Sequence, residues 1–124
     1  MAIESFNNFI SKVEEDNVKT TFQEVQKQHR ENVEILANYI QDLGGQPEEN
    51  LGMKCKMADI KLNMDLVSKA DDLEVIEKAI DGETQGVNMA EKVLRGTLDD
   101  KSRDLTGEIL KNDRNCIEKL QRLI

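Results

Sequence analysis

Four side chains that can bind protons or metal ions interrupt three otherwise apolar helical patterns: His29, Glu83, Asp113 and Cys116. An imidazole, two carboxylates and a thiol are donor groups with which proteins bind zinc and iron. Helical bundles hold such metal sites in their core, on side chains from facing helices. The four residues are therefore candidate metal ligands, provided that the helices bring them to one depth.

The spacing of neighbouring apolar residues predicts that all four side chains face inward. At about 100° per residue, each lies within about 40° of an apolar position on its own helix. These positions are Leu36 for His29, Val87 for Glu83, and Ile109 for both Asp113 and Cys116. Glu83 and Asp113 are also equally far in sequence from a turn near Leu98, roughly 22 Å at about 1.5 Å per residue. The two carboxylates are therefore expected to face each other at one level.

The elements that position these residues are amphipathic helices. Apolar residues recur in steps of three and four over residues 3–13, 18–43, 73–94 and 105–123, which predicts four helices, the first of them short. Asp16 or Asn17 is the expected N-cap of the second helix. Aromatic residues make up 3% of the chain and β-branched residues do not alternate, so no strand is predicted.

The second and third helices are separated by a long connection. Gly44 and Gly45 are a helix stop, and Asp71 and Glu74 form a capping-box signature that restarts the chain. Between them, an apolar pattern predicts a further helix in the crossover, with Met57, Ile60, Met64 and Val67 on one side.

The lengths of the connections predict the topology. Short links make antiparallel hairpins of the first and last helix pairs, whereas the middle connection is long enough to travel the length of a bundle. The predicted fold is an all-α, ferritin-like four-helix bundle with a short first helix and a long, helix-containing crossover between helices two and three. At this length we expect residues 1–124 to form a single domain.

Charge and cysteine content limit the function classes. The formal net charge is -8 and the pI is about 4.7, so the chain repels nucleic acid and anionic membranes, and neither is expected as a partner. Two cysteines are too few for a disulfide framework. Because the sequence contains neither a signal peptide nor an apolar stretch of membrane-spanning length, we expect a cytoplasmic location.

The polar residues also have a structural interpretation. A histidine inside a bundle can fix the register of the helices through hydrogen bonds without doing chemistry. Glu83 has possible hydrogen-bond partners in three amides, Asn32, Asn112 and Asn115, and Cys116 can be a small buried filler. A metal ligand set and a structural polar layer both remain open from the residues alone.

Two segments resemble the ferritin-like superfamily that includes bacterioferritin and rubrerythrin. The run HRENVEILANYIQDLGGQP, residues 29–47, is similar to the second helix of that superfamily, in which a Glu-x-x-His motif precedes the helix stop. The two motif positions fall on His29 and Asn32. The run EILKNDRNCIEKL, residues 108–120, resembles the fourth helix, and there the motif falls on Asp113 and Cys116.

The resemblance extends over nearly the whole chain, above all to small bacterial ferritin-like proteins known only as a domain of unknown function. It matches Glu83 to the single carboxylate of the third helix. A di-iron site of this superfamily uses two glutamates and two Glu-x-x-His motifs. Both motifs are changed here, and Glu4 is the plausible inward carboxylate of the short first helix. The remaining set suits a single Fe or Zn ion better than a bridged oxidase centre.

We therefore expect a non-catalytic ferritin-like bundle with a degenerate, metal-free di-iron position and a structural or protein-binding role. The alternative is a mononuclear Fe- or Zn-binding protein, or a residual iron-oxidising ferritin-like protein. A first helix of about 13 residues cannot cover helices of about 25, so part of the apolar seam stays open to water. A homodimer or larger assembly is expected to close it, and an adaptor that recruits another protein is a third possibility.

Overall fold

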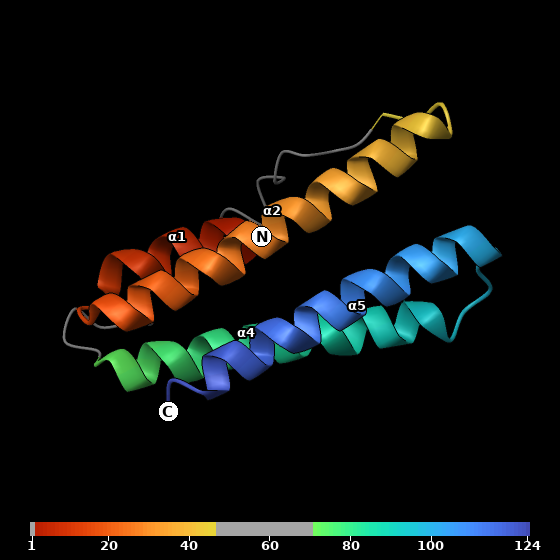
Figure 1. The fold of residues 1–124 in the computed structure, drawn as a ribbon. Coiled ribbons are helices and arrows are strands. Elements are labelled where there is room, and N and C mark those ends of the chain that lie inside the picture. Colours follow the sequence, from red (N-terminus) through yellow and green to blue (C-terminus); the bar gives the residue numbers. More distant parts are fainter. Residues whose placement is uncertain (1, 47–70) are drawn as a thin grey trace.

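The computed structural model describes residues 2–46 and 71–124, and Figure 1 shows their arrangement. These residues form the four α-helices α1 (Ala2–Lys12), α2 (Asp16–Asp42), α4 (Asp72–Leu94) and α5 (Asp100–Gln121). The helices pack as a bundle, which confirms the all-α prediction and the short first helix. The helix predicted within the crossover lies outside the described residues. None of the described helices is long and apolar enough to cross a membrane.

The directions of the helices follow from one pair of hydrogen bonds. The carboxylate of Asp72, at the start of α4, accepts the backbone N–H groups of Glu14 and Glu15, just before α2, at 2.9 Å each. Helices α2 and α4 therefore begin at the same end of the bundle and run parallel, while α1 and α5 run the other way (Figure 1). The end of α2 and the start of α4 lie at opposite ends of the bundle, as the prediction of a bundle-length crossover requires.

Each helix has two neighbours in the bundle. Helix α1 packs against α2 and α4, and α5 packs against α4 and α2. The remaining pairs, α2 with α4 and α1 with α5, therefore face each other diagonally across the core. A side chain that reaches from α2 to α4 must cross the centre of the bundle.

Most helix ends agree with the sequence signals. The carboxylate of Asp71 caps α4 by accepting the N–H of Glu74, and Asp99, next to the turn expected near Leu98, caps α5 in the same way through Ser102. Gly44 follows α2 with a φ of 84°, a left-handed conformation that suits glycine. The prediction that Asp16 or Asn17 is the N-cap of α2 is wrong. The N-cap is Glu15, and its side chain makes no capping bond. The backbone N–H of Glu15 is bonded to Asp72 of α4. Because this contact joins two different helices, the local sequence does not reveal it.

The core is concentrated where α1 lies beside the other helices. The rings of Phe6, Phe9 and Phe22 pack edge to face, with centroids 5.5 to 6.3 Å apart. Further buried residues of this cluster include Val13, Val18, Val25, Val75, Ile76, Ala79 and Leu120.

Three apolar residues that the helical pattern placed inward are exposed instead: Leu36 at 40%, Leu43 at 71% and Leu73 at 46%. Leu36 is exposed because of the position of α1. The amide of Gln26 donates to the carbonyl of Ile3, at 2.8 Å, so the first turn of α1 lies beside the middle of α2. Beyond that level, α2 lacks its α1 neighbour, and its seam is exposed.

Candidate functional site

Three of the four predicted site residues meet in a polar layer inside the bundle. His29 comes from α2, Glu83 from α4 and Asp113 from α5, and one potential ligand atom from each lies within 4.8 Å of the other two. Their side chains are 10%, 4% and 15% exposed, respectively. The equal spacing of Glu83 and Asp113 from the α4–α5 turn therefore predicted correctly that the two carboxylates share one level.

Histidine 29 contacts both carboxylates, using a different ring nitrogen for each. Its Nε2 is hydrogen-bonded to Oε1 of Glu83, across the centre of the bundle. Its Nδ1 lies 3.7 Å from Oδ1 of Asp113. At 3.7 Å the second contact is too long for a hydrogen bond, so His29 is hydrogen-bonded to Glu83 and lies beside Asp113.

Amide side chains extend the layer toward the surface between α2 and α5. The Asn32 amide donates to Oδ1 of Asp113 at 3.1 Å. The Asn32 carbonyl oxygen in turn accepts from Asn112 and from Gln28, each at 3.2 Å. Asn32 and Asn112 were possible partners of Glu83 from the sequence, but Asn32 donates to Asp113 and Asn112 donates to Asn32. These amides orient the Asp113 carboxylate and leave Glu83 to His29.

The fourth side of the layer is apolar. The ring of Phe6 on α1 lies with its centroid 5.6 Å from the His29 ring. Glu4, the inward carboxylate considered for the first helix, is half-buried and lies outside the group of candidate ligands. The apolar spacing over residues 3–13 places Phe6 on the inner side of α1, but helical periodicity does not indicate that it lies level with His29.

Burial and neighbouring charge act on Asp113. Burial raises the pKa of the Asp113 carboxyl, and the negative charge of Glu83 raises it further. The positive charge of His29 and the hydrogen bond from Asn32 act in the opposite direction, but the net change in the pKa is upward. The layer therefore favours a smaller negative charge than two free carboxylates would carry.

Cys116, the fourth predicted ligand, lies outside this group. It is 2% exposed and belongs to the apolar core cluster with Phe22 and Leu120. Burial, together with the charges of Glu83 and Asp113, raises the pKa of the free thiol to about 12. Because the thiolate is the form that binds metal or acts as a nucleophile, the thiol is poorly suited to either role.

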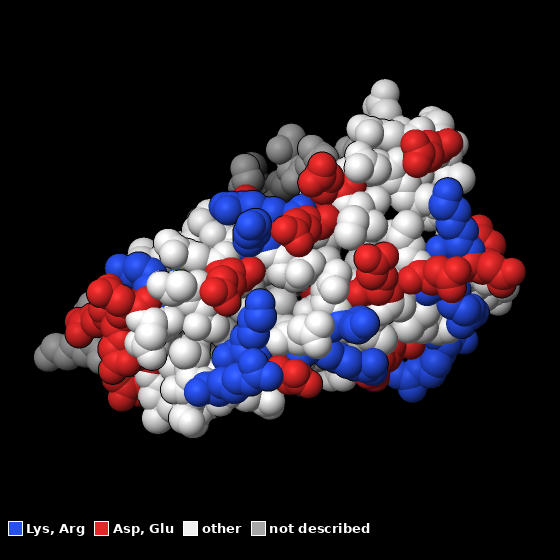
Figure 2. Space-filling model, in the orientation of Figure 1, with Lys and Arg blue, Asp and Glu red and all other residues white. Residues whose placement is uncertain are grey.

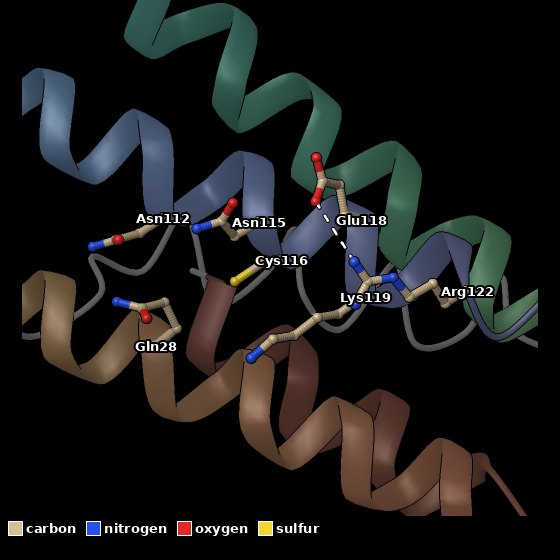
Figure 3. Close-up of a pocket in the computed structure, with 7 residues that line it drawn as sticks. All are labelled: Gln28, Asn112, Asn115, Cys116, Glu118, Lys119 and Arg122. Carbon is tan, nitrogen blue, oxygen red and sulfur yellow. Dashed lines mark ion pairs between the residues drawn. The ribbon is translucent and has the colours of Figure 1, made fainter.

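A shallow hollow lies over Cys116 on the surface between α2 and α5 (Figure 3). It has a volume of about 240 Å³ and is lined mainly by amide and charged side chains: Gln28, Asn112, Asn115, Glu118, Lys119 and Arg122. In Figure 3 the sulfur of Cys116 points toward α2, and a dashed line joins the ion pair of Glu118 and Arg122. A protonated thiol beneath an open, polar rim does not form a nucleophilic site.

The layer does not fit a bridged di-iron centre. Such a centre needs four carboxylates and two histidines, whereas the described residues bring two carboxylates and the one histidine of the chain into this layer, with Phe6 on its remaining side. A single ion is compatible with the donor set, since one nitrogen and two carboxylate oxygens provide three ligands and leave one position for a water.

The fold and the site define an all-α four-helix bundle with a buried polar layer of one histidine and two carboxylates. A family model described as a domain of unknown function (DUF2383) matches residues 1–96, which contain α1, α2 and α4. The chain belongs to this family. No curated protein and no solved structure matches the chain.

Proposed function

We propose that this chain is a non-catalytic ferritin-like bundle protein with a structural or protein-binding role, and that its degenerate di-iron position is a metal-free polar layer. One observation carries the proposal: Nε2 of His29 contacts Glu83 and Nδ1 faces Asp113. The His29 ring therefore lies between two carboxylates of the same chain and is hydrogen-bonded to one of them.

The charges of the layer support this proposal. When His29 is protonated, its single positive charge offsets one of the two carboxylate charges that face it. Asp113 also accepts a hydrogen bond from Asn32, and burial raises its pKa. The layer thus has partners for its buried charges within the protein, and a metal ion is not needed to compensate them.

The proposed relation to the ferritin-like superfamily rests on helix directions and on the level of the layer. Ferritin-like bundles consist of two antiparallel helix pairs joined by a crossover that runs the length of the bundle, and the helix directions of this chain agree with that connectivity. Side chains from α2, α4 and α5 meet inside the bundle, where that superfamily binds its metals. Phe6 of α1 is the main departure.

In the structural role, the polar layer aligns three helices. A buried polar contact is lost if one helix slides along another, so it favours a single register over alternatives of similar apolar packing. The His29–Glu83 bond couples α2 to α4, and the Asn32–Asp113 bond couples α2 to α5. A bundle aligned in this way can present its outer helix faces to a protein partner.

Metal analysis tests the proposal directly. The wild-type chain and a Glu83→Ala variant are purified without chelator from cells supplied with iron and zinc, and bound metal is quantified by mass spectrometry. We expect substoichiometric metal in both proteins, and iron(II) oxidation no faster than in buffer. One ion per chain in the wild type, lost in the variant, would contradict the proposal.

The stability of a double variant distinguishes a structural role of the layer from metal binding. Replacing His29 and Glu83 together by leucine removes the buried ion pair between these two side chains, while Asp113 keeps the hydrogen bond that Asn32 donates to it. Such exchanges of buried ion pairs are often neutral or stabilising, so we expect a free energy of unfolding within about 1 kcal/mol of the wild type or higher. A large loss of stability in the variant, together with a stabilisation of the wild type alone by added metal, would favour the metal site.

A second candidate function, mononuclear Fe or Zn binding, is favoured by the 4.8 Å grouping of His29, Glu83 and Asp113. Titration of the chain with Zn²⁺ in a calorimeter tests it. If the layer binds an ion, Asp113→Asn should weaken binding at least tenfold, whereas Cys116→Ala, whose thiol lies outside the group, should leave it unchanged. Equal affinities in both variants would place any binding elsewhere.

A further inference from the structure

Six large apolar residues of the bundle are exposed beyond the start of α1. They form a stripe on α2, in steps of three and four, and a pair on α4, and their exposed fractions range from 37% to 71%. We call them the open face: Val33, Leu36, Ile40, Leu43, Met89 and Val93.

The open face points away from α5. On α4, Met89 and Val93 each lie about 160° around the helix from Glu91. Glu91 marks the α5 side, because it is ion-paired with Arg114 at 2.6 Å. Because the two neighbours of α4 are α1 and α5, these residues lie toward the side where α1 would continue if it were longer.

On α2, too, the residues of the open face lie away from α5. Asn32 and Tyr39 mark its α5 side, since they bond to Asp113 and Ser102, respectively. Val33 and Ile40 follow them directly in sequence, which turns each about 100° further around the helix. The open face is thus the part of the seam that a full-length first helix would have covered.

The open face carries no ionisable side chain, although the whole chain has a net charge of -8 and charged side chains are spread over the surface shown in Figure 2. The charged residues within this part of α2 are Glu34 and Asp42, each about 160° around the helix from an open-face residue two positions away. Two copies can meet here without bringing their excess negative charges into direct opposition.

The area of the open face agrees with that of a stable dimer. At the exposed fractions given above, six aliphatic side chains present on the order of 500 Å² of apolar surface, near the upper end for the largest patch on a monomer. A standard interface buries about 800 Å² on each partner, of which about 60% is apolar. That apolar share is also about 500 Å², so one such interface would cover the open face.

We propose that the open face is the surface through which two copies of this chain form an isologous dimer. This inference rests on the protein-binding role proposed above and names its partner as a second copy. The apolar, uncharged character of the face makes it self-complementary, as a two-fold interface requires.

Light scattering after size-exclusion chromatography tests the dimer with matched variants. Leu36→Glu and Met89→Glu each introduce a charge on the open face, whereas Leu73→Glu introduces the same charge on an exposed leucine at the start of α4, outside that face. We expect wild type and Leu73→Glu to be dimers at micromolar concentration. Each open-face variant should dissociate at least tenfold more readily while keeping its helical circular dichroism.

Several outcomes would overturn the inference. A monomeric wild type at 100 μM would do so, including one in which hydrogen exchange shows the open face protected by residues 47–70 of the same chain. A dimer that persists unchanged in both open-face variants would place the interface elsewhere. Stoichiometric metal in a dimer that the variants disrupt would instead sink the proposed non-catalytic function and leave the dimer surface standing.

Discussion

The two halves of this bundle differ in packing although the same apolar spacing runs through both. In the half beside α1, Phe22 and Val25 of α2 are completely buried. In the half beyond α1, Leu36 on the same seam is 40% exposed. The difference teaches that helical periodicity determines the direction of a side chain, whereas its burial depends on how many helices are present at its level.

The polar layer lies at the border between the two halves. Phe6, from the first turns of α1, contacts the His29 ring on one side, and the exposed large apolar residues of α2 begin at Val33 on the other. Ionisable groups cost less to bury where water is near, and Asp113, at 15% exposure, is more accessible than Glu83. The border is therefore a favourable place for a polar layer in this bundle.

The largest expected effect compares one apolar truncation in each half. Phe22→Ala should lower the free energy of unfolding by about 3–5 kcal/mol, because it leaves a cavity among packed aromatic rings. Leu36→Ala should cost about 1 kcal/mol or less, since much of that side chain is already in water. Urea unfolding followed by circular dichroism measures both. Equal losses would mean that the half beyond α1 is packed as tightly as the other.

The border itself is tested by His29→Ala. This change leaves the Glu83 and Asp113 carboxylates facing each other without their shared partner, and we expect a loss of about 3 kcal/mol at neutral pH. Gln28→Ala is the matched control, because its amide bonds only to the outer edge of the network and should cost under about 1 kcal/mol. A His29→Ala variant as stable as the control would show that the layer is not a structural element.

Alkaline pH probes the packed half through Cys116. Burial raises the pKa of its folded-state thiol to about 12 from a usual value of 9.0, so the folded state keeps a proton that the unfolded state loses. This stability is present below pH 9 and is lost as the pH rises toward 12, by up to about 1.4 kcal/mol per pH unit.

Comparison with Cys116→Ala isolates this effect from the titration of other groups. Urea unfolding of both proteins between about pH 8 and 10.5 should show the stability difference moving against the wild type as the pH rises. Parallel pH profiles of the two proteins would indicate that the Cys116 thiol is more accessible to water than its burial implies.

The smallest expected effects concern the contacts that tie the helices together at the two ends. Asp72→Ala removes an acceptor of two backbone N–H groups at the covered end and should cost about 1–2 kcal/mol. Tyr39→Phe removes one hydrogen bond, of 2.8 Å to Ser102, at the open end and should cost about 0.5–1 kcal/mol. Thermal unfolding ranks the two, and a reversed order would argue that the open end is the more firmly held.

Much of the helix architecture could be predicted from the sequence because its signals are local. Gly44 ends α2, and Asp71 and Asp99 cap α4 and α5, each through residues a few positions away. The inward direction of His29 and Glu83 followed from helical periodicity. The shared level of Glu83 and Asp113 followed from their equal distance in sequence from the turn between α4 and α5.

The misses concern relations between helices. Cys116 shares the inward direction of Asp113, yet it lies one turn further along α5, among core residues rather than in the ligand group. Leu110 is buried although it lies about 100° around the helix from Ile109, the apolar position to which Asp113 and Cys116 were aligned. A helical wheel describes angles around one axis, so it cannot say which neighbour a side chain meets or at what distance.

By itself the sequence determined the four helices, their ends apart from the start of α2, and the polar groups that face the bundle interior, because capping and periodicity act over a few residues. Only the tertiary structure decided that His29 bridges two carboxylates, that Phe6 occupies the fourth side of the layer, and that the α2 seam beyond it is exposed. These outcomes depend on where the short α1 begins beside α2, which is set by packing between residues distant in the chain.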